Sequence, residues 1–345
     1  MSPTPKIAIA CQGGGSHAAF AAGVLSALLA PEFRDRYRLL ALSGTSGGAM
    51  CAALVWAGLI RGGADEARRG LMDFWRDLEV NNVLDAIANF WTVSSARFPV
   101  SAEISPYLYS PVAEPRLRAL LTRHLDLASL PSEPHRRARP KLLIGATDII
   151  HGLGVAFEGE SLTYDEMIAS AAVPPLFRAV QAHGTLFWDG LFSRNPPVRE
   201  FTELPERPDE IWVVQINPQQ RQCEPRAMPE IIDRRNELSG NLALSQELFF
   251  ITRINELLAQ HPSLGARYKP INIRVVELEG ELDYPSKLDR SRPMIERLLQ
   301  MGQERAGWFF PADLGGRASE YRVVRTSGSI RGGRSGSSDC RLACA

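Results

Sequence analysis

Residues 39–60 form a run of 22 residues without a charged side chain, and this run restricts what the chain can fold into. It is long enough to span a bilayer. However, the sequence GTSGG at residues 44–48 places turn-forming residues between two apolar segments. We therefore predict a buried strand over Tyr37–Leu42, a tight turn, and a buried helix over Ala49–Leu59, in preference to a membrane span.

The same order of strand, turn and helix occurs earlier in the chain. Lys6–Cys11 is a short apolar run, three glycines follow at 13–15, and Ala18–Ala30 has the small apolar residues of a buried helix. Such alternation favours a mainly parallel sheet with helices on both faces, which is a three-layer α/β/α sandwich. Further strands are expected in KLLIGATDI, GVAFEG, TLFWDG, IWVVQINP and INIRVVELEG.

Further helices are predicted between and after these strands, and residues 64–139 differ in character from the rest of the chain. Thr163 and Glu166 form a capping-box pattern, and apolar spacing predicts helices over Glu230–Leu258 and Arg292–Phe310. Residues 64–139 predict a helical insertion rich in aromatic residues, which forms either a layer with its own small core or the apolar wall of a site. We expect one domain over residues 5–310 and a tail over 311–345, disordered from about residue 326.

Charge and cysteine content exclude several classes of partner. The chain has 39 acidic and 39 basic residues, so no basic excess points to nucleic acid. Its five cysteines are scattered, with neither a disulfide nor a metal-site pattern, which fits a reducing compartment. The apolar run at the amino terminus is too short for a signal peptide. We expect a cytoplasmic protein; transient contact with a membrane surface and the oligomeric state stay open.

The GTSGG turn is the strongest chemical signal. It is a G-x-S-x-G pattern between an apolar strand and an apolar helix, the context in which a strained turn lifts a serine clear of the backbone. The serine would stand at the positive end of the helix that follows. This context favours Ser46 as a nucleophile over a simple packing turn.

A serine nucleophile needs a base, and the histidines offer no obvious one. His261 is the only histidine that follows the best acidic candidate, Asp189, and it occupies a predicted helix end. Asp189 itself lies in FWDGLFSRNPP, at the end of a predicted strand. It forms either an Asp-Gly turn or part of a site at the carboxyl edge of the sheet.

The glycines at 13–15 could hold a phosphate or an oxyanion. A dinucleotide fingerprint needs glycine where this chain has Ala18, and no Gly-Lys-Ser/Thr completes a Walker loop. The backbone N–H groups at a helix start remain suited to an anion, including the oxyanion of acyl transfer.

Together, QGGGSH, GTSGG, SAAVPPLF, WDG and QINP make the chain resemble the patatin-like phospholipases, over about residues 5–310. The resemblance is closest to bacterial patatin-like proteins with a QGGGSH opening. It implies a Ser-Asp dyad in which Ser46 is the nucleophile and Asp189 the base. It also implies an oxyanion hole and supporting motif glycines: Gly13, Gly14, Gly15 and Gly47 for the hole, and Gly44, Gly48 and Gly190 for support.

The chain departs from the family pattern at three positions. His17 and Ala18 stand where the family usually has Arg or Lys and then Gly, and Leu191 stands where it has Gly or Ala. The resemblance implies a serine lipid acyl hydrolase that acts on phospholipids or other lipid esters through an acyl-enzyme, with no cofactor or metal. The alternatives are a weak or inactive lipid-binding protein of the same fold and, less favoured, a nucleotide-binding Rossmann protein.

Overall fold

The computed structural model describes residues 4–80, 83–95, 105–108, 113–131, 140–174, 176–221, 224–280, 282–283, 285–310 and 319–320. Within these residues the strands form one sheet in the order β5-β6-β3-β2-β1-β7-β8-β9, with β4 paired to β3. The strands are β1 (Lys6–Cys11), β2 (Arg38–Gly44), β3 (Lys141–Asp148), β4 (Leu153–Glu158), β5 (Val180–Ala182), β6 (Thr185–Asp189), β7 (Glu210–Gln215), β8 (Asn272–Glu277) and β9 (Ser319–Glu320).

The centre of the sheet is parallel and its margins are antiparallel. Neighbours along β3-β2-β1-β7-β8 are all parallel. The β4, β6 and β5 strands on one side, and β9 on the other, pair antiparallel. The predicted mainly parallel sheet therefore describes the centre, which is the part that carries the Gly-rich turns.

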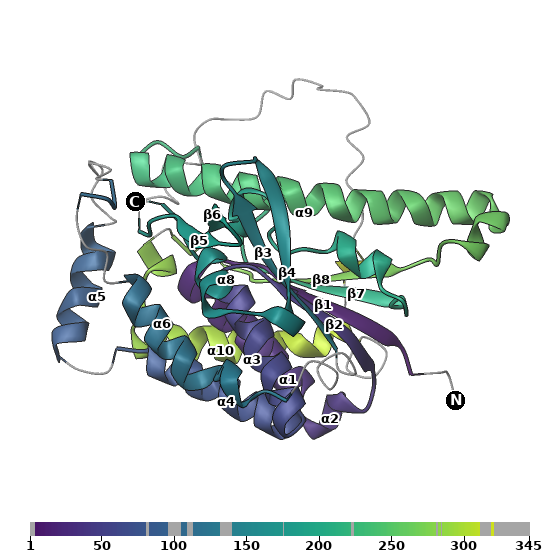
Figure 1. Cartoon of the computed structure of the whole chain (residues 1–345), viewed down its shortest axis with the longest axis horizontal. Helices are drawn as coiled ribbons and strands as arrows, with labels where there is room; N and C mark the ends of the chain where they lie inside the picture. Colours follow the sequence, from purple (N-terminus) through teal and green to yellow (C-terminus); the bar gives the residue numbers. More distant parts are fainter. Residues whose placement is uncertain are drawn as a thin grey trace, which may run out of the picture.

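Helices cover both faces, which confirms the predicted α/β/α layers (Figure 1). One face carries α1 (Ala19–Leu28), α3 (Gly47–Arg61) and α10 (Arg292–Ala306), and α4 (Ala64–Leu78) packs against α3. The long helix α9 (Met228–Gln260) crosses the other face. The remaining α-helices of the described residues are α2 (Pro31–Arg34), α5 (Val83–Ser95), α6 (Ala113–His124) and α8 (Tyr164–Ala169).

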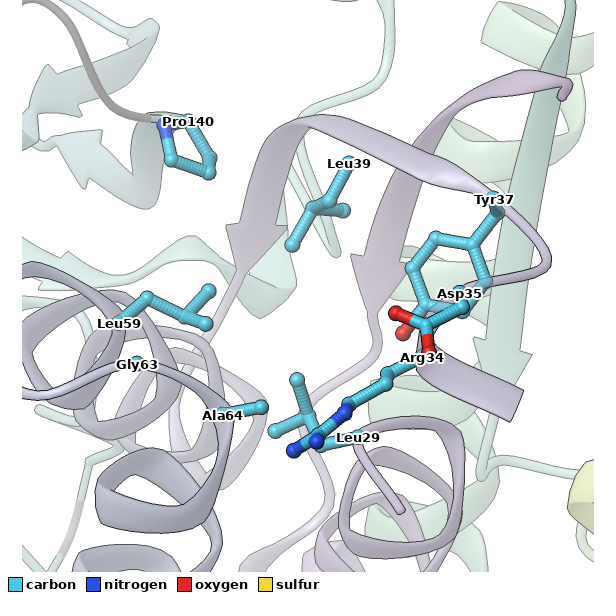
Figure 2. A pocket seen from close by; sticks show the side chains of 9 residues that line it. All are labelled: Leu29, Arg34, Asp35, Tyr37, Leu39, Leu59, Gly63, Ala64 and Pro140. Carbon is cyan, nitrogen blue, oxygen red and sulfur yellow. The ribbon is translucent and has the colours of Figure 1, made fainter. Parts of the chain in front are cut away.

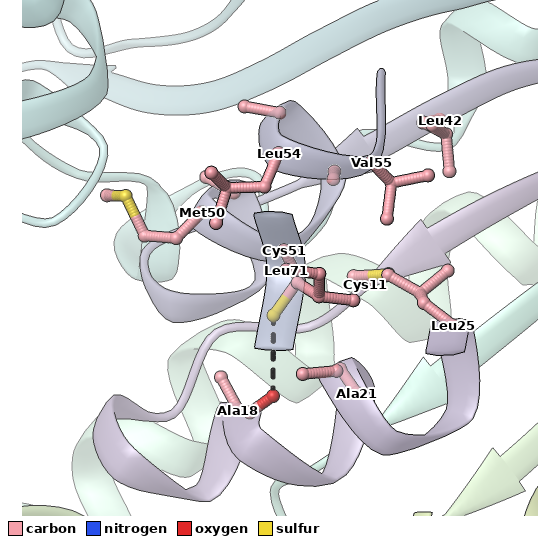
Figure 3. Close-up of a cluster of buried hydrophobic side chains, with 14 of the residues drawn as sticks. Cys11, Ala18, Ala21, Leu25, Leu42, Met50, Cys51, Leu54, Val55 and Leu71 are labelled. Carbon is pink, nitrogen blue, oxygen red and sulfur yellow. Dashed lines mark hydrogen bonds between the residues drawn. The ribbon is translucent and has the colours of Figure 1, made fainter. Parts of the chain in front are cut away.

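The alternation of side chains along β1 explains the two cores. Ile7, Ile9 and Cys11 face α1 and α3, while Ala8 and Ala10 face α9. Figure 3 shows the first core, in which the thiol of Cys51 donates to the Ala18 carbonyl at 3.4 Å. Because residues 39–60 fold as β2, a turn and α3 inside this core, their lack of charge reflects burial within the protein.

The described part of the insertion at 64–139 contains the helices α4, α5 and α6. Phe74 and Trp75 of α4 and Leu121 of α6 belong to the core of the main sheet. The described part of the insertion therefore extends that core and does not enclose a core of its own. Phe98 and Tyr109, two of the aromatic residues that suggested an apolar wall, lie outside the described residues.

Other boundaries agree closely with the sequence. The Thr163 capping box is present and opens α8, and α10 passes at Gly307 into a 3₁₀ turn that ends at Phe309. Ser319 and Glu320 pair with β8 as β9, so part of the expected tail joins the sheet. The region from residue 326, predicted to be disordered, lies outside the described residues.

Candidate active site

The two Gly-rich turns meet at the carboxyl edge of the parallel strands. Cys11, the last residue of β1, is paired with Gly44, the last residue of β2. The Thr45 N–H donates to the Cys11 carbonyl at 3.3 Å, which ties the turn after β2 to the end of β1. The sheet register therefore brings the glycines at 13–15 beside Ser46.

Ser46 has a strained backbone between β2 and α3. Its φ of 56° and ψ of −127° lie where residues other than glycine rarely occur. Such strain persists only where the surroundings enforce it, and it gathers at functional sites. Ser46 precedes the first residue of α3, Gly47, so its side chain stands at the positive end of a 15-residue helix.

Asp189 ends β6 and is fully buried, with an exposed fraction of 0%. The Leu191 N–H donates to Oδ1 at 2.8 Å, whereas Oδ2 has no partner among the described residues. Burial raises the pKa of Asp189 to about 7, against the opposing effects of the Leu191 N–H and the Ser46 hydroxyl. The Ser46 hydroxyl is thus one of the groups that act on the Asp189 carboxyl, so the two side chains are neighbours.

A single segment connects the backbones of these two residues. The Ser46 N–H donates to Ser170 Oγ at 3.0 Å, and the Ser170 hydroxyl donates to the Gly145 carbonyl at 2.6 Å. Two residues later the Ala172 carbonyl accepts from the Asp189 N–H at 3.1 Å. Residues 170–172, which follow α8, therefore fix the position of Ser46 relative to Asp189.

Three backbone amides near Ser46 are available to an anion. Within the described part of the chain, the N–H groups of Gly14, Gly15 and Gly47 have no acceptor. The Gly13 N–H is not available, because it donates to Asn195 Oδ1 at 2.7 Å. Gly13 therefore differs from the other residues expected in the oxyanion hole.

Close backbone approach accounts for the glycines of both motifs. A Cβ on Gly13 would lie 2.6 Å from the Thr45 carbonyl oxygen and 2.8 Å from Ser46 Cβ. A Cβ would lie equally close to backbone atoms at three other motif glycines: Gly44, Gly48 and Gly190. These glycines allow the two turns and the Asp189 strand to pack against one another.

His17 has a structural position. It is 1% exposed, and its Nε2 lies 2.7 Å from Ser286 Oγ. Burial and the neighbouring Lys287 lower the pKa of His17 to about 3, against the effect of Glu237. His17 is therefore neutral near pH 7 and does not replace the cation that the family usually has at this position.

The other departures also have simple structural explanations. Leu191 contributes its backbone N–H to Asp189, and any residue except proline can supply that group. The Ala18 side chain packs where a Cβ on Gly47 would lie, 2.6 Å away. Neither substitution removes a contact from Ser46 or Asp189.

Among the described histidines, none is hydrogen-bonded to Ser46 or Asp189. His124 pairs with Asp77, His151 with Asp148, and His183 with Glu166. His261 caps the end of α9 and is exposed, as the sequence predicted. None of these described rings therefore contributes a hydrogen bond to Ser46 or Asp189.

Sequence reasoning assigned no role to three residues that hold the site together. They are Ser170, which accepts from Ser46, and the two asparagines that contact Gly13, Asn195 and Asn217. All three lie inside segments that the sequence had singled out: SAAVPPLF, FWDGLFSRNPP and QINP. Buried polar residues beside a turn were the available signal, because such groups need partners.

A cavity of about 310 Å³ lies elsewhere in the molecule (Figure 2). Tyr37 and Leu39 line it where β2 begins, and Pro140 lines it just before β3. Since β2 and β3 are parallel, this is the amino edge of the sheet, opposite Ser46. The cavity is therefore not the space in front of the candidate nucleophile.

In the part of the chain that the structure describes, no group of three or more His, Cys, Asp or Glu side chains is arranged to hold a metal ion. Cys11 and Cys51 are buried free thiols, and burial raises the pKa of both. No described helix combines the length and the apolar character that crossing a bilayer requires.

Comparison with protein families identifies the class to which this geometry belongs. The family model described as "Patatin-like phospholipase" matches residues 9–202, which is more than half of the chain and includes Ser46 and Asp189. The chain therefore belongs to the patatin-like phospholipase family. No curated protein sequence matches it.

Solved structures that resemble the chain are larger and distant in sequence. VipD from Legionella pneumophila is 12% identical, with a TM-score of 0.43, over 88% of this chain and 66% of VipD. The type III effector ExoU is 16% identical, with a TM-score of 0.38, over 88% of this chain and 53% of ExoU. ExoU is also solved in a complex with SpcU from Pseudomonas aeruginosa, at a TM-score of 0.37. The chain thus spans about two thirds of VipD and half of ExoU.

Proposed function

We propose that the chain is a serine lipid acyl hydrolase that cleaves carboxylic esters of phospholipids or related lipids with a Ser46–Asp189 dyad. One observation carries the proposal: the buried Asp189 carboxyl neighbours a serine held in a strained turn, and its Oδ2 has no partner among the described residues. A buried acceptor left without a donor is costly, so a function is the better explanation for its retention.

In the proposed reaction, Asp189 takes the proton of Ser46 while Ser46 Oγ attacks the ester carbonyl. The carbonyl oxygen gains the negative charge, which the N–H groups of Gly14, Gly15 and Gly47 stabilise. The tetrahedral intermediate collapses, the ester C–O bond breaks, and the leaving alcohol takes the proton from Asp189. Water, deprotonated by Asp189, then attacks the acyl-enzyme and releases the fatty acid.

The electrostatics of the site support these roles. A base is most effective when its pKa is near the working pH, and burial brings the pKa of Asp189 to about 7. The positive end of α3 favours both the serine alkoxide and the oxyanion. No step uses a metal or a cofactor.

Hydrolysis of a p-nitrophenyl acyl ester tests the proposal. Ser46→Ala and Asp189→Asn should each reduce turnover at least 1,000-fold, as expected when a nucleophile or its base is removed. Ser26→Ala is a matched control, because Ser26 is also a buried serine but lies on α1. Turnover that survives in Ser46→Ala would refute the assignment.

The same assay separates the proposed enzyme from a lipid-binding protein of the same fold. A folded wild-type protein that binds phosphatidylcholine vesicles but shows no turnover dependent on Ser46 would support the binding protein. We place the enzyme in the cytoplasm, meeting a lipid surface transiently. A panel of phospholipids and neutral lipid esters, run with wild type and Ser46→Ala, would define the substrate.

A further inference from the structure

We propose that Asn195 and Asn217 are positioning residues that hold Gly13 between them and thereby aim the Gly14 amide at the acyl oxygen. This inference rests on the proposed hydrolase function and adds two residues to the machinery described above. Neither asparagine contacts Ser46 through a hydrogen bond, so their action is exerted through the glycine loop.

The two asparagines bind opposite ends of one residue. The Gly13 N–H donates to Asn195 Oδ1 at 2.7 Å, and the Gly13 carbonyl accepts from Asn217 Nδ2 at 2.9 Å. Both side chains are buried, with exposed fractions of 1% for Asn195 and 6% for Asn217. They come from different parts of the chain, after β6 and after β7, so two separate segments hold the glycine loop.

Because the peptide bond is planar, fixing the Gly13 carbonyl also fixes the direction of the Gly14 N–H group. The Gly13 carbonyl and the Gly14 N–H belong to the same peptide unit and point in opposite directions when the peptide is trans. By holding the carbonyl, Asn217 directs the Gly14 N–H away from itself, and that N–H has no acceptor in the described structure. Gly13 contacts Ser46, so this peptide unit lies beside the nucleophile.

Asn217 is itself firmly held. Its backbone N–H donates to Gln12 Oε1 at 2.8 Å, and Gln12 Nε2 donates to Asn241 Oδ1 at 2.8 Å. Asn241 lies on α9 and donates to the Pro218 carbonyl at 3.1 Å. These amides are uncharged, so the support for the oxyanion loop does not titrate and adds no negative charge near the developing oxyanion.

A donor that is fixed before reaction stabilises an oxyanion more than one that must reorient. Removing an oxyanion donor costs about 100- to 1,000-fold in kcat, and misdirecting one should cost somewhat less. Ground-state binding of the ester does not depend on this donor. The expected signature is therefore a fall in kcat with little change in KM.

The test measures p-nitrophenyl ester hydrolysis by the full chain carrying Asn217→Leu, Asn195→Leu or both. Each single variant should lower kcat about 10- to 100-fold, with KM within about twofold of wild type. Because both asparagines act through Gly13, the double variant should lose much less than the product of the two single losses. The inhibition constant of an acyl trifluoromethyl ketone, which forms an oxyanion on the serine, should rise by the same factor as kcat falls.

Asn255→Leu is the matched control. Asn255 also binds one residue at both ends: its Nδ2 donates to the Ile271 carbonyl at 2.7 Å, and its Oδ1 accepts from the Ile271 N–H at 3.0 Å. Ile271 precedes β8, at the edge of the sheet opposite Ser46. This variant should lose stability but keep its kcat, and circular dichroism and the melting temperature report folding for all variants.

Several outcomes would overturn the inference. They are a folded Asn217→Leu with wild-type kcat, an equal fall in kcat in Asn255→Leu, and losses that multiply in the double variant. Asn217→Ala replaces Asn217→Leu if the larger side chain prevents folding. A wild-type protein without activity dependent on Ser46 would instead refute the proposed function, and the inference with it.

Discussion

Gly13 approaches Ser46 so closely that a Cβ on Gly13 would lie 2.8 Å from the Cβ of Ser46. It would also lie 2.6 Å from the Thr45 carbonyl oxygen, which belongs to the backbone. The glycine loop and the serine turn are therefore packed against each other without an intervening side chain. In the proposed reaction, this contact keeps the amides of Gly14 and Gly15 near Ser46.

Gly13→Ala should therefore abolish most of the activity. The added methyl group would separate the loop from the serine turn, and a displacement of about 1 Å in a catalytic site costs about 100-fold in rate. Gly70→Ala is the control, since nothing lies within 4 Å of a Cβ at that position on α4. It should keep full activity and gain about 0.5–1 kcal/mol of stability. Equal activity in the two variants would contradict the packing described here.

The rate of ester hydrolysis should depend on the ionisation of Asp189. The base must be deprotonated, and burial raises its pKa to about 7, so kcat/KM should rise with pH and level off above about 7. The neutral His17 does not account for such a limb, because its pKa is lowered to about 3. A pH profile between 5 and 9 measures this. An acid limb at the ordinary carboxyl pKa of about 4 would contradict the buried base.

The same burial of the Asp189 carboxyl should destabilise the folded protein at neutral pH. The folded carboxyl has a pKa of about 7 and the unfolded one about 3.9. Between these values the folded state binds a proton that the unfolded state does not, so stability is lost as pH rises from about 4 to 7. Asp189→Asn removes this loss, which is on the order of 4 kcal/mol above pH 7.

Melting temperatures of wild type and Asp189→Asn at pH 4.5 and pH 8 measure this effect. The melting temperature of Asp189→Asn minus that of wild type should be larger at pH 8 than at pH 4.5. The comparison between the two pH values cancels the cost of burying the amide, which is the same at both. A difference in melting temperature that does not change with pH would show that Asp189 is not held as a buried acid.

The layered fold could be predicted because each strand, turn and helix leaves a pattern within a short segment of the sequence. Buried strands and helices leave long uncharged runs such as residues 39–60, and the turns between them need glycine, so the parallel centre of the sheet was readable. The antiparallel margins were not, since β4 and β6 have the composition of any buried strand and their direction depends on pairing with β3.

The candidate site could be predicted only in part, because some of its contacts join segments that are far apart in the sequence. Ser46 and the glycines belong to short motifs with a local mechanism; Asp189 was a candidate from its place at a strand end, and the family resemblance supplied its role as the base. Ser170 and Asn217 act across 124 and 204 residues of sequence, respectively. Their hydrogen bonds exist only after the sheet has assembled, so a polar residue beside a turn suggests that a partner is needed but does not name it. The Asn195 bond to the Gly13 amide likewise appeared only in the structure.

Substitutions of His17 test whether the protein needs the cation that the family usually has at this position. His17→Arg restores the usual residue, but it would bury a second cation beside Lys287, and Glu237 already pairs with Arg221, Arg234 and Lys287. We expect it to destabilise the protein by about 3 kcal/mol or more. His17→Gln can keep a hydrogen bond to Ser286 and should retain most stability and activity. Urea denaturation measures the stability of both variants, and ester hydrolysis measures their activity. A His17→Arg variant as stable as wild type would contradict the neutral, structural role of His17.

Covalent labelling with a fluorophosphonate tests the central claim most directly, because only an activated serine reacts. Mass spectrometry should find one phosphonyl group per chain, on Ser46, and the labelling rate should fall at least 100-fold in Asp189→Asn while that variant remains folded. A folded wild-type protein that is not labelled, that is labelled at another residue, or that reacts equally fast with and without Asp189 would contradict the Ser46–Asp189 dyad.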